Sequence, residues 1–146
     1  MLLSGKKNMT LAIGNVKALV VDDHMTTRTE IEKALRAMGC KKVDQAASTE
    51  EALDKLETGN HYDVIFADIK MPGKSGYDLM IKCRQNKACN FTAIIAVSAE
   101  SEERYIIDAL HAGATSYIVK PPEPAKIQEH VNKALGWIEQ RRAEAG

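Results

Sequence analysis

Five short apolar runs at fairly regular intervals constrain the fold of this chain more than any other feature. The runs cover residues 18–21, 43–47, 64–67, 93–97 and 116–119. Their starts lie roughly 20 to 30 residues apart, which leaves room for a helix and two short loops between strands. The runs are nearly continuous rather than alternating, as is typical of a parallel sheet covered on both faces. The sequence therefore predicts an α/β fold, a doubly wound parallel five-stranded sheet of (βα)5 type.

The segments between the runs have the spacing of helices. Ile31, Ala34, Leu35 and Met38 follow a helical period, which predicts a helix packed on the sheet. Residues that commonly begin or end helices bound these segments. They are Ser48, Ser75 and Ser101 as N-caps, Gly39, Gly59 and Gly113 as stops, and Pro124 in the first turn of the last helix.

Length and composition favour one soluble domain. We expect that domain at residues 16–141 of the 146, after a flexible N-terminal tail at 1–15. Lys plus Arg and Asp plus Glu both number 20, so no excess charge indicates nucleic acid or an anionic membrane as a partner. No apolar stretch approaches the ~20 residues of a membrane span, and the start lacks a secretory signal. Three cysteines without a CxxC pair favour a reducing cytoplasm.

Polar residues follow four of the five predicted strands. The first strand ends in Asp22 and Asp23, the third in Asp68, the fourth in Ser98 and the fifth in Lys120. Ligands of an open parallel sheet bind at the carboxyl ends of its strands, so these side chains are expected on one rim. A single Asp in such a place is usually a turn or helix cap. The joint pattern indicates a site.

The residue types at this rim suit phosphoryl transfer. Three crowded carboxylates repel one another unless a cation joins them, and oxygen ligands favour Mg²⁺. Lys120 would offset the charge of an incoming phosphoryl group, and one Asp could act as the nucleophile. His24 has no second His or Cys at ligand spacing, so we interpret it as a loop or helix-start residue.

Four motifs carry a family resemblance. VVDDH at 20–24, FADIKMPGKSGYDL at 66–79, AVSAE at 96–100 and YIVKPP at 117–122 are similar to those of the CheY-like response-regulator receiver domain. The resemblance extends from about Val16 to Trp137. It implies the strand order 2-1-3-4-5 of this fold.

The resemblance also implies a role for each site residue. Asp68 would accept a phosphoryl group from a phosphohistidine of a sensor histidine kinase of the chemotaxis type. Asp23, Asp68 and the backbone carbonyl of Lys70 would bind Mg²⁺ directly, and Asp22 through water. Lys120 would contact the phosphoryl group and precede a cis proline bond. Ser98 and Tyr117 would form the switch pair, Ser98 moving to the phosphoryl oxygen and Tyr117 turning inward.

The resemblance implies a monomeric cytoplasmic switch rather than an enzyme, with only self-phosphorylation and self-dephosphorylation as its own reactions. Since no output domain follows the last helix, signalling is expected through a downstream protein, with the flagellar motor switch as a candidate. The acidic run Ser101-Glu102-Glu103 stands where motor-binding members tend to be basic. Lys70 replaces the Asn common in chemotaxis members. A phosphate sink or phosphorelay intermediate without motor binding is the alternative.

Two other classes remain as rivals. A haloacid-dehalogenase-type phosphatase also uses a strand-end Asp, Mg²⁺ and a Lys, but it needs a DxD pair where this chain has Asp22-Asp23-His24. A nucleotide- or flavin-binding protein of the same fold would need a phosphate loop after the first strand, and acids there would repel a phosphate.

Overall fold

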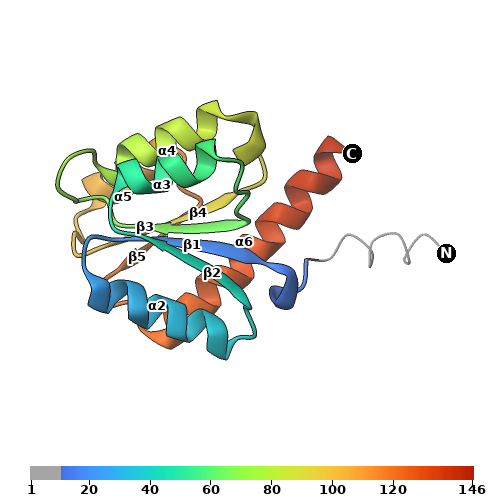
Figure 1. Ribbon diagram of the computed structural model, residues 1–146, viewed down its shortest axis with the longest axis horizontal. Coiled ribbons are helices and arrows are strands. Elements are labelled where there is room, and N and C mark those ends of the chain that lie inside the picture. Colours follow the sequence, from blue (N-terminus) through green and yellow to red (C-terminus); the bar gives the residue numbers. More distant parts are fainter. Residues whose placement is uncertain (1–10) are drawn as a thin grey trace.

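The fold is a five-stranded parallel sheet between two layers of helices, as a computed structural model of the chain shows (Figure 1). The structure describes residues 11–146. The strands are β1 (Lys17–Val21), β2 (Lys42–Ala46), β3 (Val64–Ala67), β4 (Ala93–Ser98) and β5 (Ser116–Val119). They pair in the order β2-β1-β3-β4-β5, and each pair is parallel. The predicted fold class and strand order are confirmed.

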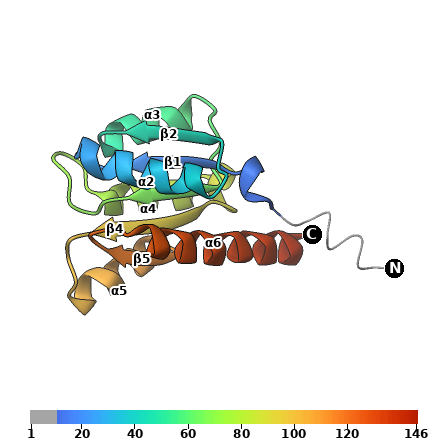
Figure 2. The same cartoon turned by 90° about the horizontal axis from the view of Figure 1, so that it is seen from below.

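The helices divide between the two faces of the sheet. Their bounds are α2 (Met25–Ala37), α3 (Thr49–Glu57), α4 (Gly76–Gln85), α5 (Glu103–Ala112) and α6 (Pro124–Ala145), with 3-10 turns η1 (Ile13–Asn15) and η2 (Lys87–Cys89). Helices α2 and α6 cover one face, and α3, α4 and α5 cover the other (Figures 1 and 2). This doubly wound arrangement leaves the carboxyl ends of the strands at one open edge.

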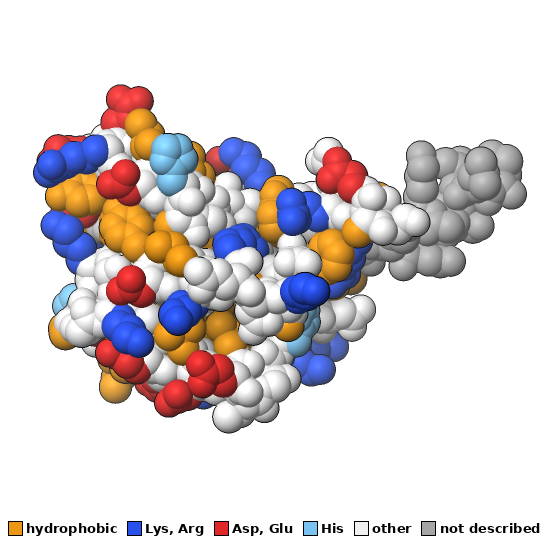
Figure 3. Space-filling model, turned by 90° about the horizontal axis from the view of Figure 1, so that it is seen from above, with side chains coloured by type: hydrophobic (Ala, Val, Ile, Leu, Met, Phe, Trp, Pro, Cys, Tyr) orange, Lys and Arg blue, Asp and Glu red, His pale blue; other side chains and the backbone are white. Residues whose placement is uncertain are grey.

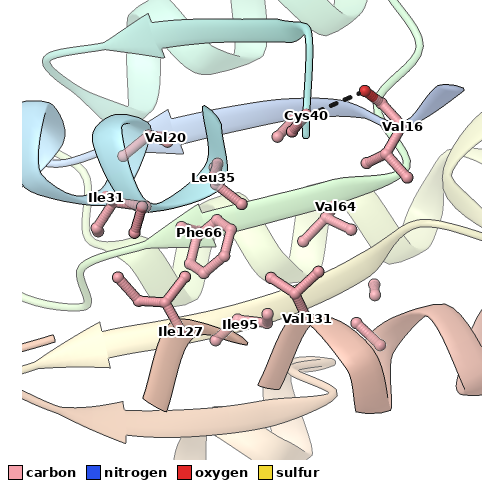
Figure 4. Packing of buried hydrophobic residues seen from close by; sticks show 14 of the residues in the cluster. Val16, Val20, Ile31, Leu35, Cys40, Val64, Phe66, Ile95, Ile127 and Val131 are labelled. Atoms are coloured by element: carbon pink, nitrogen blue, oxygen red, sulfur yellow. Dashed lines mark hydrogen bonds between the residues drawn. The ribbon is translucent and has the colours of Figure 1, made fainter. Parts of the chain in front are cut away.

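The core on the α2–α6 side is built from side chains of three layers. Phe66 of β3 lies between Ile31 and Leu35 of α2 and Ile127 and Val131 of α6 (Figure 4). All five are at most 1% exposed. Burial of each such side chain stabilises the fold by about 1.5–3 kcal/mol, so this packing holds β3 against α2 and α6.

The helix caps confirm two of the three predicted N-caps. Ser48 accepts a hydrogen bond from the backbone N–H of Glu51 at 3.1 Å, and Ser75 forms a reciprocal capping box with Asp78. The prediction of Ser101 as the cap of α5 is wrong. Glu102 occupies that position, in extended conformation and without a side-chain cap hydrogen bond.

The ends of the chain differ from the expected boundaries. Residues 1–10 of the expected tail lie outside the described residues. Leu11 and Ile13 pack against the core, and the backbone N–H of Leu11 donates to Glu139 Oε1 at 3.4 Å. Helix α6 continues to Ala145, past the expected boundary at 141. No helix within residues 11–146 is both long and apolar enough to cross a membrane.

Candidate functional site

Three of the predicted site residues form a buried charged cluster at the carboxyl edge of the sheet. Lys120 Nζ lies 2.8 Å from Asp22 Oδ2 and 3.0 Å from Asp68 Oδ2. Asp22 is 1% and Asp68 5% exposed, because each directly follows a central strand whose residues are buried. One ammonium group therefore pairs with two buried carboxylates, so the cluster carries more negative than positive charge.

The pKa values of Asp68 and Lys120 are both raised, as expected of a cluster with excess negative charge. Burial raises the pKa of Asp68, and the hydrogen bond from Lys120 only partly opposes it. Burial would lower the pKa of Lys120, but the hydrogen bonds to Asp22 and Asp68 outweigh it and raise that pKa. Both shifts favour holding a proton, as expected of a site that favours an additional cation.

A metal ion fits beside these groups. One ligand atom each from Asp22, Asp23, His24 and Asp68 lies within 4.8 Å of all the others. Asp23 Oδ1 is buried and has no hydrogen-bond partner among the described residues, although a buried oxygen without one costs free energy. Carboxylate oxygens are the donors that Mg²⁺ prefers. The donor set and the orphaned oxygen both fit a divalent cation.

His24 lies at the start of α2, as interpreted, and its side chain also belongs to this cluster. It is the N-cap of α2, but its side chain makes no cap hydrogen bond. Instead its Nδ1 lies 3.2 Å from Asp22 Oδ1 and 3.3 Å from Asp23 Oδ1. The only sign of this contact in the sequence is that His24 directly follows two acids.

Ser98 and Tyr117 meet at the backbone of one residue, Glu100. The N–H of Glu100 donates to Ser98 Oγ at 3.2 Å, and the Tyr117 hydroxyl donates to the carbonyl of Glu100 at 2.7 Å. Burial raises the pKa of the Tyr117 hydroxyl above its ordinary value of 10.0. The two residues expected to act as a switch pair are thus linked through the loop after β4.

The backbone and side chain of Lys70 have separate contacts. Its N–H donates to Asp68 Oδ1 at 3.2 Å. Its Nζ lies 2.9 Å from Glu100 Oε1 and 5.0 Å from the centre of the Tyr105 ring. The hydrogen bond to Glu100 raises the pKa of Lys70. The ammonium group therefore pairs with the loop after β4.

Two backbone features shape the loops around Asp68 and Lys120. Gly76 begins α4, and a Cβ atom at that position would overlap the carbonyl of Asp68. The structure thus requires a glycine that sequence reasoning passed over. The Lys120–Pro121 peptide bond is cis, as the resemblance implied.

The comparisons with known proteins agree with this geometry. Residues 18–132 match the family described as "Response regulator receiver domain". The chain is 34% identical to Chemotaxis protein CheY-3 of Vibrio cholerae over 82% of this chain and 91% of the relative. It is 36% identical to Chemotaxis protein CheY1 of Helicobacter pylori over 83% of this chain and 98% of the relative. The solved Chemotaxis response regulator CheY4 of Vibrio cholerae superposes with a TM-score of 0.75 at 28% identity, covering 82% of this chain and 98% of that one.

Proposed function

The chain belongs to the response regulator receiver domain family, and on that premise we propose that Asp68 is its phosphoacceptor, in a Mg²⁺-dependent switch. The observation that carries this proposal is the pairing of a buried carboxylate, Asp68, with Lys120 at 3.0 Å. A lone buried carboxylate would be a costly structural feature, whereas a carboxylate beside a fixed ammonium group is suited to receive an anion.

The proposed reaction needs little from the protein besides position and charge. An oxygen of Asp68 attacks the phosphorus of a phosphohistidine, the P–N bond breaks, and the imidazole leaves with the electron pair. Lys120, whose Nζ lies 3.0 Å from Asp68 Oδ2, would contact the phosphoryl oxygens, and Ser98 would supply a hydroxyl. A Mg²⁺ ion held by Asp23, Asp68 and the carbonyl of Lys70, with Asp22 through water, would neutralise the phosphate charge.

Hydrolysis of the acyl phosphate would return the carboxylate and release inorganic phosphate. We assign no other reaction to the chain, so it acts as a switch rather than as an enzyme. In the switch, Ser98 turns to a phosphoryl oxygen and loosens its contact with the backbone of Glu100. Because Tyr117 bonds the carbonyl of the same residue, its position would change with the loop.

A groove beside the site is suited to the kinase. It has a volume of about 420 Å³ and lies between α2 and the loop that follows Lys120. Its walls are largely apolar, from Ala34, Ala37, Pro122 and Pro124, with charged residues among them. Because Pro121 and Pro122 of its wall directly follow Lys120, we expect a partner that brings a phosphohistidine to Asp68 to contact this surface. Ala37→Glu should slow phosphorylation by the kinase and leave labelling by a small phosphodonor unchanged.

The curated relatives are chemotaxis proteins, and we propose a cytoplasmic role in chemotaxis signalling for this chain. Glu102 and Glu103 are exposed at the start of α5, so an acidic motor segment would be repelled there. The alternative is a phosphate sink or relay intermediate without motor binding. The affinity for the motor switch peptide, measured with and without beryllofluoride, distinguishes a motor-binding regulator from a phosphate sink or relay intermediate.

The central test is labelling by acetyl phosphate in the presence of Mg²⁺. Wild-type protein should gain one phosphoryl group by intact mass, and EDTA should abolish the gain. Asp68→Asn should prevent it, whereas Asp54→Asn, at an exposed acid of α3, should not. Equal labelling of wild type and Asp68→Asn would overturn the assignment.

A further inference from the structure

We propose that His24 is a nitrogen donor of the metal site and gives this protein a stronger preference for Mn²⁺, Co²⁺ and Ni²⁺ over Mg²⁺ than an all-oxygen site has. The inference rests on the metal site of the proposed function, and it concerns a side chain outside the carboxylate set assigned there. It arises from the position of the imidazole over the two acids that end β1.

The distances match the spacing of donors around one small ion. Adjacent ligands of an octahedral ion with bonds of ~2.1 Å lie about 3.0 Å apart. His24 Nδ1 lies 3.2 Å from Asp22 Oδ1 and 3.3 Å from Asp23 Oδ1. Two ligands on opposite sides of such an ion lie about 4.2 Å apart. One ligand atom each of Asp23, His24 and Asp68 lies within 4.8 Å of the others, so a small movement of side chains would bring all three around one ion.

A backbone hydrogen bond holds the Cα of His24 in place, whereas its exposed imidazole ring has room to rotate. The N–H of His24 donates to Asp22 Oδ1 at 2.8 Å, which holds its Cα beside the acids. The side chain is 68% exposed. A small rotation would direct the lone pair of a neutral imidazole at an ion bound by Asp23 and Asp68, without disturbing the core.

The imidazole changes which ions the site prefers. Mg²⁺ strongly favours oxygen ligands and keeps several waters, so it gains little from a nitrogen donor. Imidazole suits later divalent ions, whose affinity for nitrogen sites rises from Mn²⁺ through Co²⁺ to Ni²⁺. His24 should therefore raise affinity along that series and leave Mg²⁺ affinity nearly unchanged.

Metal binding without any phosphodonor tests the proposal. Calorimetric titration with each metal chloride should show about tenfold weaker Ni²⁺ and Co²⁺ binding in His24→Asn than in wild type, with Mg²⁺ binding within about twofold. Asn is a favourable N-cap, so α2 should stay folded. His111→Asn, at an exposed histidine of α5, is the matched control and should change none of these affinities.

Direct ligation has a spectroscopic signature. Electron spin-echo spectra of Mn²⁺-bound protein should show coupling to a histidine nitrogen, lost in His24→Asn and kept in His111→Asn. Absence of this coupling in wild type, or equal loss of Ni²⁺ and Mg²⁺ affinity in His24→Asn, would overturn the inference. Either result would leave the labelling of Asp68 intact. Failure of that labelling with normal metal binding would overturn the proposed function instead.

Discussion

Lys70 Nζ and Glu100 Oε1 lie 2.9 Å apart, so an ion pair joins the loop after β3 to the loop after β4. Each partner stands two residues beyond a site residue, Asp68 and Ser98. The Lys70 side chain is 59% exposed and that of Glu100 27%, which places the pair at the surface beside the buried cluster. The pair therefore connects the loop that follows Asp68 to Glu100, the residue whose backbone Ser98 and Tyr117 contact.

Lys70→Met should loosen the loop after β4. Glu100 would lose its ion pair, and the hydrogen bonds of its backbone to Ser98 and Tyr117 would open more often. Amide hydrogen exchange over residues 99–102 should accelerate, whereas Lys74→Met, at an exposed lysine of the same region, should leave it unchanged. Unchanged exchange in Lys70→Met would show that the pair does not hold the loop. Because an exposed pair contributes little, the free energy of unfolding should barely change.

Asp68→Asn should stabilise the fold in EDTA at neutral pH. Burial raises the pKa of Asp68, so the charged carboxylate is less favourable in the fold than in the unfolded chain. Removing the charge should increase the free energy of unfolding by ~1 kcal/mol in urea titrations, within the usual range of single substitutions. Asp54→Asn should have no such effect, and a destabilised Asp68→Asn would contradict the argument.

Lys120→Met should have the opposite effect. Without the ammonium group, Asp22 and Asp68 become two buried carboxylates with no fixed counter-charge. Breaking a buried ion pair by removing one partner typically costs about 3–5 kcal/mol. Chemical denaturation in EDTA should show that loss, and Mg²⁺ should restore part of it. The control is Lys126→Met, at an exposed lysine of α6. A loss no larger than the control's would show that the carboxylates relax into solvent.

Gly76→Ala should disrupt the site through the backbone. The added Cβ would overlap the carbonyl of Asp68, and that carbonyl can move only with the residue that carries it. We expect a loss of ~2 kcal/mol or more in unfolding free energy, together with slower labelling of Asp68. Gly136→Ala is the matched control, since a Cβ there meets nothing within 4 Å. It should stabilise helix α6 by about 0.5–1 kcal/mol. Labelling at the wild-type rate in Gly76→Ala would contradict the expected movement.

His130→Gln should flatten the pH dependence of stability. His130 Nδ1 lies 2.9 Å from Ser116 Oγ, and burial lowers the pKa of His130 below its ordinary value of 6.5. As pH falls through 6.5, the unfolded chain takes up this proton before the folded chain does. Stability must then decrease with falling pH until the lowered pKa is passed. Urea titrations at pH 7.5 and 5.5 should show a smaller difference for His130→Gln than for wild type. An equal difference would mean that other groups cause the slope.

The sequence by itself determined the fold and the convergence of three side chains, Asp22, Asp68 and Lys120, at one edge of the sheet. The predicted runs of 4 or 5 residues became the five strands with only small shifts at their ends. The three inner strands are almost fully buried, as expected of a parallel sheet covered on both faces, whereas the edge strands β2 and β5 are partly exposed. Asp22, Asp68 and Lys120 converge because each follows a strand, and parallel strands end at one edge. Peptide connectivity fixes both relationships, so they can be read from residue order alone.

Only the tertiary structure decided where the longer side chains point. Lys70 and Glu100 are thirty positions apart in the sequence, so local spacing does not predict their ion pair. His24 could equally have faced solvent, because the neighbouring residues in the sequence do not fix its rotamer. The cap of α5 falls at Glu102 instead of Ser101 because the loop geometry after β4 sets where the helix begins. Gly76 is needed because its backbone approaches that of Asp68. Each depends on contacts between separate elements, which exist only once the chain is packed.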